Sequence, residues 1–569
     1  MTQTPIIEFS NFTFKYYSQA EPTLYDINLK IYPGEKILIV GPSGSGKSTL
    51  GHCINGLIPF AYKGEITGSQ KINGRDTQEM NIFELSKLVG TVLQDSDAQF
   101  VGLSTGEDIA FALENDSIPF EAMHERVQKV ARMVNMQDLL ASSPFELSGG
   151  QKQRTSLAGV MVDDVDILLF DEPLANLDPA TGKTAIEIIE DIHQHSKKTV
   201  LIIEHRLEDV LHQHVDRILV IRDGRIIADQ DAHTLVSSDI LVETGIREPL
   251  YVTALKYAGA QVTCDLQPGY ITTLKTDLEK DALVSWYESV QHPADQPAAP
   301  SILSIENLNF SYDGIRPILE NINIDIREGE MVSLVGKNGA GKSTLSKLLC
   351  GFEKPDSGII HYYGEDIADK TIKERAEFIG VVLQNPNQMI SKPLIYDEVA
   401  LGLRFREVPE DEIKERVEKV LEVCGLSPFI EWPISALSYG QKKRVTIASI
   451  LALGPKILIL DEPTAGQDFR HYTEIMEFLL ELNKLGVTII LITHDMHLML
   501  EYTPRAIVLA EGRIVADTAA SVVLTDSDVI QKANLKETSL FNLAQMAGIP
   551  DGTGFVQGFI DYERKLRDR

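Results

Sequence analysis

Two stretches of nearly the same spelling constrain this chain more than any other feature. Residues 40–50 read V-G-P-S-G-S-G-K-S-T-L, and residues 335–345 read V-G-K-N-G-A-G-K-S-T-L. Each follows a short apolar run and leads into a helical pattern, so backbone N–H groups and a helix N-terminus converge on one anion. One copy can arise as an ordinary glycine-rich turn. Two copies in matching settings predict two nucleotide sites, with Lys47 and Lys342 on phosphate oxygens.

Further landmarks return in the same order, at separations of 289–296 residues. The pairs are Tyr16 and Tyr312, Lys47 and Lys342, Gln94 and Gln384, Ser148 and Ser438, Asp171 and Asp461, and His205 and His494. Landmarks that match in order and spacing indicate an internal duplication. We expect a first half at residues 1–260, a linker region at 261–300 that ends in a proline-rich spacer, and a second half with a C-terminal extension at 301–569.

Apolar runs alternate with helical segments in both halves, as at residues 166–171 and 199–205. Continuous apolar strands separated by helices predict a parallel sheet covered on both faces. Between the glutamine and serine landmarks the pattern becomes helical, at residues 120–134 and again at 410–424. The predicted class is therefore α/β, with a helical subdomain inserted into each half.

Composition excludes several classes of protein. The chain has 83 acidic and 53 basic residues, and its net charge of −30 repels a phosphate backbone, so nucleic acid is a poor candidate partner. The four cysteines form no C-x-x-C pair, which gives no support for a structural metal. No apolar run reaches the ~18–20 residues of a membrane span, and the N-terminus lacks the regions of a signal peptide. We therefore expect the chain in the cytosol.

An acidic pair follows one apolar run in each half, Asp171-Glu172 and Asp461-Glu462. Adjacent buried carboxylates repel each other unless they share a cation or a proton. Each Asp is predicted to reach Mg²⁺, usually through water, and each Glu to polarise an attacking water molecule. An exposed acidic strand end is the simpler alternative, and it fits two copies poorly.

A Ser-Gly turn opens a helix in each half, L-S-G-G-Q at residues 147–151 and L-S-Y-G-Q at 437–441. Such a turn offers N–H groups to a phosphate, although a single copy would be read as a plain helix cap. His205 and His494 close apolar strands, where a lone histidine is more often structural.

These motifs, in this order and twice over, resemble two ATP-binding-cassette ATPase domains joined in one chain. The resemblance covers nearly all of the chain apart from the linker region. It implies two P-loop NTPase domains in tandem, each with a mostly parallel sheet core, a small antiparallel β subdomain and the inserted helical subdomain. It also implies a head-to-tail pair of cassettes, in which each ATP lies between one half's nucleotide loop and the other half's Ser-Gly signature.

The resemblance further assigns roles to residues. Glu172, Glu462, His205 and His494 are the expected catalytic residues. The expected Mg²⁺ ligands are Ser48, Gln94, Asp171, Ser343, Gln384 and Asp461. The expected ATP-binding residues are Tyr16, Gly41, Ser43, Gly44, Gly46, Lys47, Ser48, Thr49, Gln94, Ser148, Gly149, Gly150, Tyr312, Gly336, Asn338, Gly339, Gly341, Lys342, Ser343, Thr344, Gln384, Ser438 and Gly440. For Tyr16 and Tyr312, composition alone leaves adenine stacking and plain packing equally favoured.

One signature departs from the family pattern, because Tyr439 stands where the first half has Gly149. A bulky side chain there would lie beside the approach to the γ-phosphate. We therefore expect the site that contains Lys47 to hydrolyse ATP more slowly than the site that contains Lys342. The segments after the acidic pairs also differ between the halves, at residues 175–178 and 465–468, which adds to the expected asymmetry.

Residues 94–101 and 107–115 resemble the tandem ATPases of energy-coupling-factor importers, which power the uptake of vitamins or trace metals. Residues 437–448 resemble the second half of a tandem type linked to uptake of a thiamine precursor. The resemblance implies a transmembrane energy-coupling subunit and a substrate-capture membrane subunit as partners. The chain would then lie peripherally on the cytoplasmic face of the membrane.

Three other classes stay open. Tandem sugar-importer ATPases share the layout, but their second nucleotide loop is commonly degraded, whereas residues 336–343 are intact. Tandem cassettes that act on ribosomes carry a long charged arm between their halves, and the linker here is short and acidic. DNA-repair cassettes carry zinc-type cysteines, which this sequence lacks.

Overall fold

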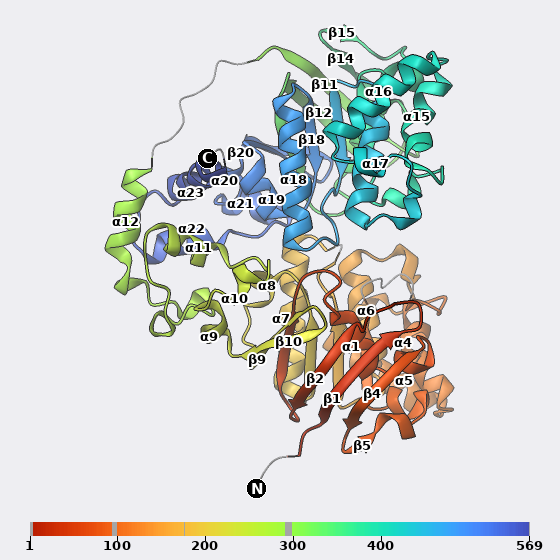
Figure 1. The fold of residues 1–569 in the computed structure, drawn as a ribbon, viewed down its shortest axis with the longest axis vertical. Helices are drawn as coiled ribbons and strands as arrows, with labels where there is room; N and C mark the ends of the chain where they lie inside the picture. Colours follow the sequence, from red (N-terminus) through yellow and green to blue (C-terminus); the bar gives the residue numbers. More distant parts are fainter. Residues whose placement is uncertain (1–3, 94–98, 176, 291–298, 568–569) are drawn as a thin grey trace. The chain divides into compact units, whose positions relative to one another are not determined.

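The computed structural model describes residues 4–93, 99–175, 177–290 and 299–567 (Figure 1). The chain divides into two compact units, and each is described by itself. The first unit comprises Met1–Glu288 together with Asp468–Arg470 and Asn542–Ile549. The second comprises Ser289–Gln467, His471–Phe541 and Pro550–Arg569.

The first unit begins with a four-stranded antiparallel sheet in the order β2-β1-β4-β5. Its strands are β1 (Ile7–Tyr16), β2 (Leu24–Ile31), β4 (Gly64–Ile72) and β5 (Arg75–Asp76). In β1 the apolar residues Ile7, Phe9, Phe12 and Phe14 are buried, while the polar residues between them are more exposed. This alternation, interrupted by a bulge, is what a sheet with one buried face requires.

A six-stranded sheet carries the site of this unit, in the order β10-β9-β3-β8-β7-β6. The strands are β3 (Lys36–Val40), β6 (Val89–Val92), β7 (Ile167–Asp171), β8 (Thr199–Ile203), β9 (Arg217–Arg222) and β10 (Arg225–Gln230). All pairs are parallel except β9 with β10. Since β3, β8 and β7 are neighbours and parallel, the loops that follow them meet at one edge of the sheet.

Helices flank the sheet and form the inserted subdomain. They are α1 (Lys47–Ile54), α2 (Leu57–Phe60), α3 (Ile82–Ser86), α4 (Thr105–Asn115), α5 (Phe120–Met133), α6 (Gly149–Met161), α7 (Pro179–Ser196), α8 (Leu207–Val210), α9 (Ala232–Val236), α10 (Ile240–Glu243), α11 (Leu250–Tyr257) and α12 (Lys280–Ser289). The inserted subdomain consists of α4, α5 and α6, which contact one another. The helical subdomain predicted between the glutamine and serine landmarks is therefore confirmed.

Packed structure continues beyond residue 260. Leu266, Tyr270, Leu274, Leu283 and Trp286 are buried. The Tyr270 hydroxyl donates to the Val215 carbonyl (3.0 Å), which fastens this segment to the loop before β9. The first part of the region predicted as a linker thus belongs to the first unit, and α12 follows it.

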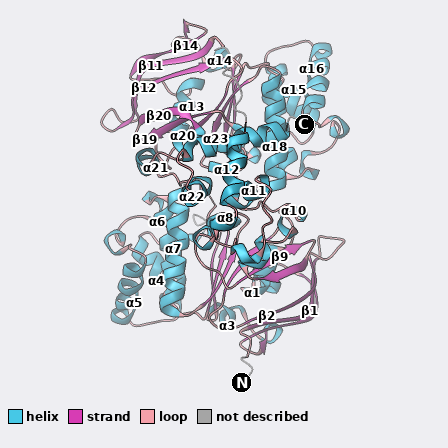
Figure 2. Cartoon of the chain, turned by 90° about the vertical axis from the view of Figure 1, so that its left-hand side faces the viewer, coloured by secondary structure: helices cyan, strands magenta, loops and turns pink. Residues whose placement is uncertain are grey.

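The second unit repeats the plan (Figure 2). Its antiparallel sheet has the order β12-β11-β14-β15, and its six-stranded sheet the order β16-β17-β18-β13-β19-β20. The strands are β11 (Ser301–Ser311), β12 (Pro317–Arg327), β13 (Met331–Val335), β14 (Ser357–Tyr362), β15 (Glu365–Asp366), β16 (Ile379–Val382), β17 (Ile457–Asp461), β18 (Thr488–Ile492), β19 (Arg505–Ala510) and β20 (Arg513–Ala519). The helices are α13 (Lys342–Cys350), α14 (Ile372–Arg375), α15 (Ile395–Phe405), α16 (Glu410–Val423), α17 (Tyr439–Leu451), α18 (Phe469–Lys484), α19 (Met496–Tyr502), α20 (Ala520–Val523), α21 (Ser527–Ala533) and α23 (Gly552–Arg567). A further helix, α22 (Ser539–Met546), belongs for most of its length to the first unit.

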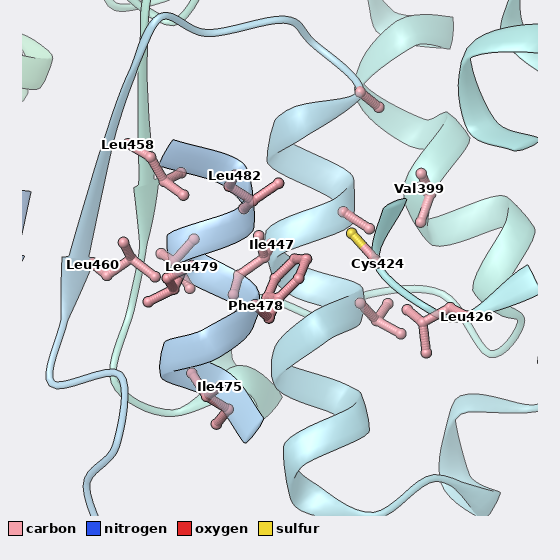
Figure 3. Packing of buried hydrophobic residues seen from close by; sticks show 14 of the residues in the cluster. Val399, Cys424, Leu426, Ile447, Leu458, Leu460, Ile475, Phe478, Leu479 and Leu482 are labelled. Carbon is pink, nitrogen blue, oxygen red and sulfur yellow. The ribbon is translucent and has the colours of Figure 1, made fainter. Parts of the chain in front are cut away.

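One apolar cluster of the second unit joins the inserted helices to the sheet (Figure 3). Ile447 of α17 and Phe478 of α18 lie side by side in it, and Leu458 and Leu460 of β17 are on its sheet side. Burying side chains of this size contributes about 1.5–3 kcal/mol each. The strand that ends in Asp461 is therefore held by the same core that holds α17. The predicted α/β class, with two sheets and an inserted helical subdomain in each copy, is confirmed.

Candidate functional site

The loop between β3 and α1 forms the predicted cradle for phosphate. Gly46 caps α1 with a left-handed backbone (φ 103°), and a Cβ there would lie 2.9 Å from the Thr23 carbonyl oxygen. Gly341 takes the same place before α13, with φ 107°. Only glycine adopts this conformation without strain, so both helices begin where their N–H groups can point into the loop.

Each loop lysine is buried and folds back over its own loop. The Lys47 Nζ donates to the carbonyls of Gly41 (2.8 Å) and Pro42 (2.9 Å). The Lys342 Nζ donates to the carbonyls of Gly336 (2.7 Å) and Lys337 (3.1 Å). Burial lowers the pKa of Lys47, although the charges of Glu172 and other nearby acids oppose that effect. A buried ammonium that donates to the carbonyls of its own loop is suited to an anionic ligand.

The acidic pairs lie at the ends of β7 and β17, where Asp171 and Asp461 are the last strand residues. The Ser48 hydroxyl donates to Asp171 Oδ1 (3.4 Å), so the hydroxyl and the carboxylate predicted to hold Mg²⁺ face each other. Burial, reinforced by the charge of Glu172, raises the pKa of Asp171 to about 6. Burial and the charge of Glu462 likewise raise the pKa of Asp461. Neighbouring carboxylates and hydroxyls are oxygen ligands of the kind that Mg²⁺ takes, and a cation would relieve their repulsion.

Glu172 and Glu462 have left-handed backbones, with φ of 51° and 45°. For a residue other than glycine such a conformation costs about 1–3 kcal/mol, and such strain gathers at functional sites. The N–H groups of Glu172 and Glu462 still donate to Ile203 and Ile492 (2.9 Å each). In each unit the backbone hydrogen bonds of the parallel sheet therefore extend one residue past the strand, to Glu172 or Glu462. The left-handed backbone of that residue turns its side chain away from the sheet.

A histidine follows the next strand in each unit. His205 Nδ1 is 3.6 Å from Glu172 Oε1, and His494 Nδ1 is 2.6 Å from Glu462 Oε1. Burial lowers the pKa of His205, but the hydrogen bond to Glu172 and the charges of Glu204 and Glu172 outweigh it, and the net shift is upward. The same hydrogen bond, with the charges of His205 and Lys47, lowers the pKa of Glu172 despite its burial. The structure thus brings both predicted catalytic residues together in each unit.

The signature serines cap the helices that follow them. Ser148 and Gln151 form a capping box at α6, as Ser438 and Gln441 do at α17. The box uses the N–H groups of its own two residues, so those of Gly149 and Gly150 are the ones available for a phosphate.

The two signature glycines of α6 differ in the space around them. A Cβ at Gly150 would lie 2.4 Å from Thr181 Cγ2, whereas a Cβ at Gly149 would make only an ordinary contact of 3.6 Å with Leu177. The position that the second half fills with Tyr439 is therefore the one with room for a side chain. Tyr439 is 39% exposed, and its hydroxyl donates to the Gln384 carbonyl (3.2 Å).

The predicted adenine residues lie beside the nucleotide loops. The hydroxyl of Tyr16 is 3.2 Å from Thr49 Oγ1, and that of Tyr312 is 3.3 Å from Thr344 Oγ1. The same contact in both units fixes each ring next to the helix that follows the loop. Of the two glutamines predicted to bind ATP and Mg²⁺, Gln94 lies outside the described residues. Gln384 lies in the segment after β16.

Comparison with known proteins identifies the family. A family model described as "ABC transporter" matches residues 24–175 and, again, residues 319–465. The chain belongs to the ABC transporter ATP-binding family. Its members hydrolyse ATP, and this chain is an ATPase with two cassettes in tandem. A second family model, described as an "ATP-binding cassette cobalt transporter", matches residues 238–310.

Curated relatives match over the whole length. An ABC transporter ATP-binding protein of Clostridium perfringens is 57% identical over 568 residues, covering 100% of both chains. One of Enterococcus faecalis is 56% identical over 566 residues, covering 99% of each. Among solved structures, the cbiO1 protein of Clostridium perfringens, described as part of the ABC transporter complex cbiONQ, is 40% identical. The match covers 41% of this chain and 95% of that one, with a TM-score of 0.39.

Two polar residues of these ABC cassettes escaped the sequence analysis. Lys443 of α17 is buried, and its Nζ donates to the carbonyls of Leu383 (3.0 Å) and Gln384 (2.6 Å). Burial lowers its pKa to about 8, against the charges of Asp461 and Glu462. Glu204 is buried directly before His205. Each of these residues differs from its counterpart in the other copy, since Gln153 matches Lys443 and Thr493 matches Glu204. A comparison of the two copies could therefore have pointed to both positions.

Proposed function

We propose that the chain is the ATP-hydrolysing subunit of a membrane importer of the energy-coupling-factor type, which takes up a vitamin, a vitamin precursor or a trace metal. Its partners would be a transmembrane energy-coupling subunit and a substrate-capture membrane subunit, with the chain peripheral on the cytoplasmic face. The observation that carries the proposal is the match of residues 238–310 to the family described as a cobalt transporter cassette. It falls between two complete sets of ATPase residues.

In the proposed reaction each loop binds the phosphates of one ATP. Lys47 and Lys342 leave their loop carbonyls for the β- and γ-phosphates, and the helix N-termini of α1 and α13 supply further N–H donors. Mg²⁺, held in the first cassette by Ser48 and Asp171, would neutralise charge between the phosphates. Glu172 and Glu462 orient and polarise the attacking water, and His205 and His494 hold that geometry beside the γ-phosphate. The sharing of each ATP between the two halves stays a prediction from the sequence.

Exposed apolar side chains support a protein partner. Leu103 and Val101, directly before α4, are 85% and 65% exposed. Large apolar side chains exposed on a segment that follows the glutamine loop are suited to a hydrophobic partner surface. Among the described residues, no helix is long and apolar enough to cross a membrane.

Purification from solubilised membranes tests the proposal. The tagged native chain is expected to bring down two small integral membrane proteins, and reconstitution of the set should give ATP-dependent uptake. Mass spectrometry of bound small molecules then separates a vitamin from a metal cargo. The variant with both Lys47→Ala and Lys342→Ala is the matched control, which should copurify with the same proteins but give no uptake. Comigration with ribosomes, with no membrane protein recovered, would overturn the assignment.

A further inference from the structure

Glu204 is a buried carboxylate with an unusual number of partners. It follows β8, and none of its surface is exposed (0%). One carboxylate oxygen accepts from the N–H groups of His205 (2.9 Å) and Arg206 (3.3 Å), and the other accepts from that of Leu174 (3.2 Å). A buried charge persists only when it is paired or hydrogen-bonded in this way. Glu204 therefore ties the loop after β7 to the loop after β8.

The same carboxylate lies against the imidazole of His205. Its Oε1 is 3.5 Å from His205 Nδ1, while Glu172 Oε1 is 3.6 Å from that nitrogen. The ring nitrogen is thus nearly equidistant from two carboxylates, that of Glu204 directly after β8 and that of Glu172 directly after β7.

The second cassette is built differently at this point. Thr493 takes the position of Glu204, and its hydroxyl donates to Glu462 Oε2 (3.5 Å) and accepts from the N–H of Asp495 (3.0 Å). His494 Nδ1 lies 2.6 Å from Glu462 Oε1. Glu462 therefore has the histidine close to itself, whereas Glu172 shares its histidine with Glu204.

We infer that Glu204 is a positioning residue that holds His205 between two carboxylates and so sets hydrolysis in the first cassette apart from hydrolysis in the second. The inference rests on the proposed roles of Glu172 and His205. A second carboxylate favours the charged form of the imidazole, against burial and the neighbouring charge of Arg206, which lower the pKa of His205, and it fixes the ring through the backbone of His205 itself. A charged, fixed imidazole is the stronger hydrogen-bond donor to a γ-phosphate.

Steady-state ATP hydrolysis by the full chain tests the inference, with kcat, KM and the pH profile measured for each variant. Glu204→Gln keeps the shape of the side chain and removes its charge. In a Glu462→Gln background, where the first site carries the remaining turnover, we expect Glu204→Gln to lower kcat by about fivefold or more with KM for ATP within about twofold. The alkaline limb of the pH profile should move to lower pH, because one of the two anions that favour the charged imidazole is gone. A purely structural role would lower the rate equally at every pH.

Thr493→Glu is the reciprocal variant and keeps the test decisive if Glu204→Gln folds poorly. In a Glu172→Gln background, a carboxylate beside His494 should draw the imidazole from Glu462 and change the kcat of the second site, with KM for ATP within about twofold. Unchanged kcat and pH profiles in the variants that fold overturn the role of Glu204. Glu172→Gln is assayed in parallel in the same Glu462→Gln background, because turnover there equal to that of Glu462→Gln alone would overturn the proposed site itself, a different failure from that of Glu204 alone.

Discussion

The burial of Asp171 at the end of β7, reinforced by the charge of Glu172, makes a measurable prediction about stability. Asp171 lies beside Glu172 in a buried place, and its pKa is raised from an ordinary 3.8 to about 6. Replacing Asp171 by Asn keeps the shape and an oxygen that can accept from Ser48, but removes the charge. In the absence of Mg²⁺ and nucleotide, Asp171→Asn should therefore stabilise the first unit.

The size of the effect follows from the shift. A difference of 6 − 3.8 = 2.2 pH units corresponds to about 3 kcal/mol, at 1.36 kcal/mol per unit. The folded state binds this proton more tightly than the unfolded state does, so the native chain loses stability as the pH rises from about 4 to about 6. Above pH 6 the whole cost is present. The variant should exceed the native chain by up to about 3 kcal/mol at pH 7.5, and by almost nothing at pH 4.

The two tryptophans allow each unit to be followed alone. Trp286 lies in the first unit and Trp432 in the second. With Trp432→Phe as background, urea unfolding in EDTA is followed through Trp286 at several pH values. Asp265→Asn, which removes the same charge from an exposed place in the first unit, is the control and should change little. A native chain more stable than Asp171→Asn at pH 7.5, or a difference independent of pH, would refute the reasoning.

Three further predictions concern the two cassettes. Glu462→Gln should remove more of the total ATPase activity than Glu172→Gln, because the site with Lys47 is predicted to be the slower one; equal losses in phosphate release would contradict this. Tyr439→Phe loses the hydroxyl that donates to Gln384 and should lower the stability of the second unit by about 1 kcal/mol, read from the urea midpoint of Trp432 with Trp286→Phe as background. Phe478→Ala empties part of the core beneath α17 and should cost about 3–5 kcal/mol in the same assay, while the Trp286 transition, measured in the Trp432→Phe background, stays in place.

The sequence was sufficient for the fold because the signals were local and came twice. A five-residue run such as residues 36–40 is buried throughout, as a central parallel strand must be, and the glycines of the nucleotide loop have the backbone that the motif requires. The packing of residues 261–288 was harder to foresee. Its buried residues before α12, such as Leu266 and Leu274, lie in or beside short 3₁₀ turns rather than in a regular helix or strand, so the tertiary contacts are needed to reveal their burial.

Much of the site could also be predicted, since the motifs indicated Lys47, Asp171 and Glu172, and the family resemblance added His205. Their geometry could not. The left-handed backbone of Glu172 depends on how β7 and β8 pair, and no residue type signals it. The partners of Lys443 lie about 60 residues away in the chain, at Leu383 and Gln384. A lysine within a helical pattern is read as exposed until the fold places it under the glutamine loop.

The duplication separates what the reaction demands from what it tolerates. In both copies the loop lysine, the acidic residues and the histidine keep their places, and even the strained backbones of Glu172 and Glu462 agree within a few degrees, with φ of 51° and 45°. The two copies differ at residues that contact these side chains or their loops. Glu204 of the first copy corresponds to Thr493 of the second, and Gln153 corresponds to Lys443. These residues touch the reacting side chains or their loops without replacing them. Such changes can alter the rate of one site while leaving its chemistry intact, so two unequal sites are the expected result of this pattern of divergence.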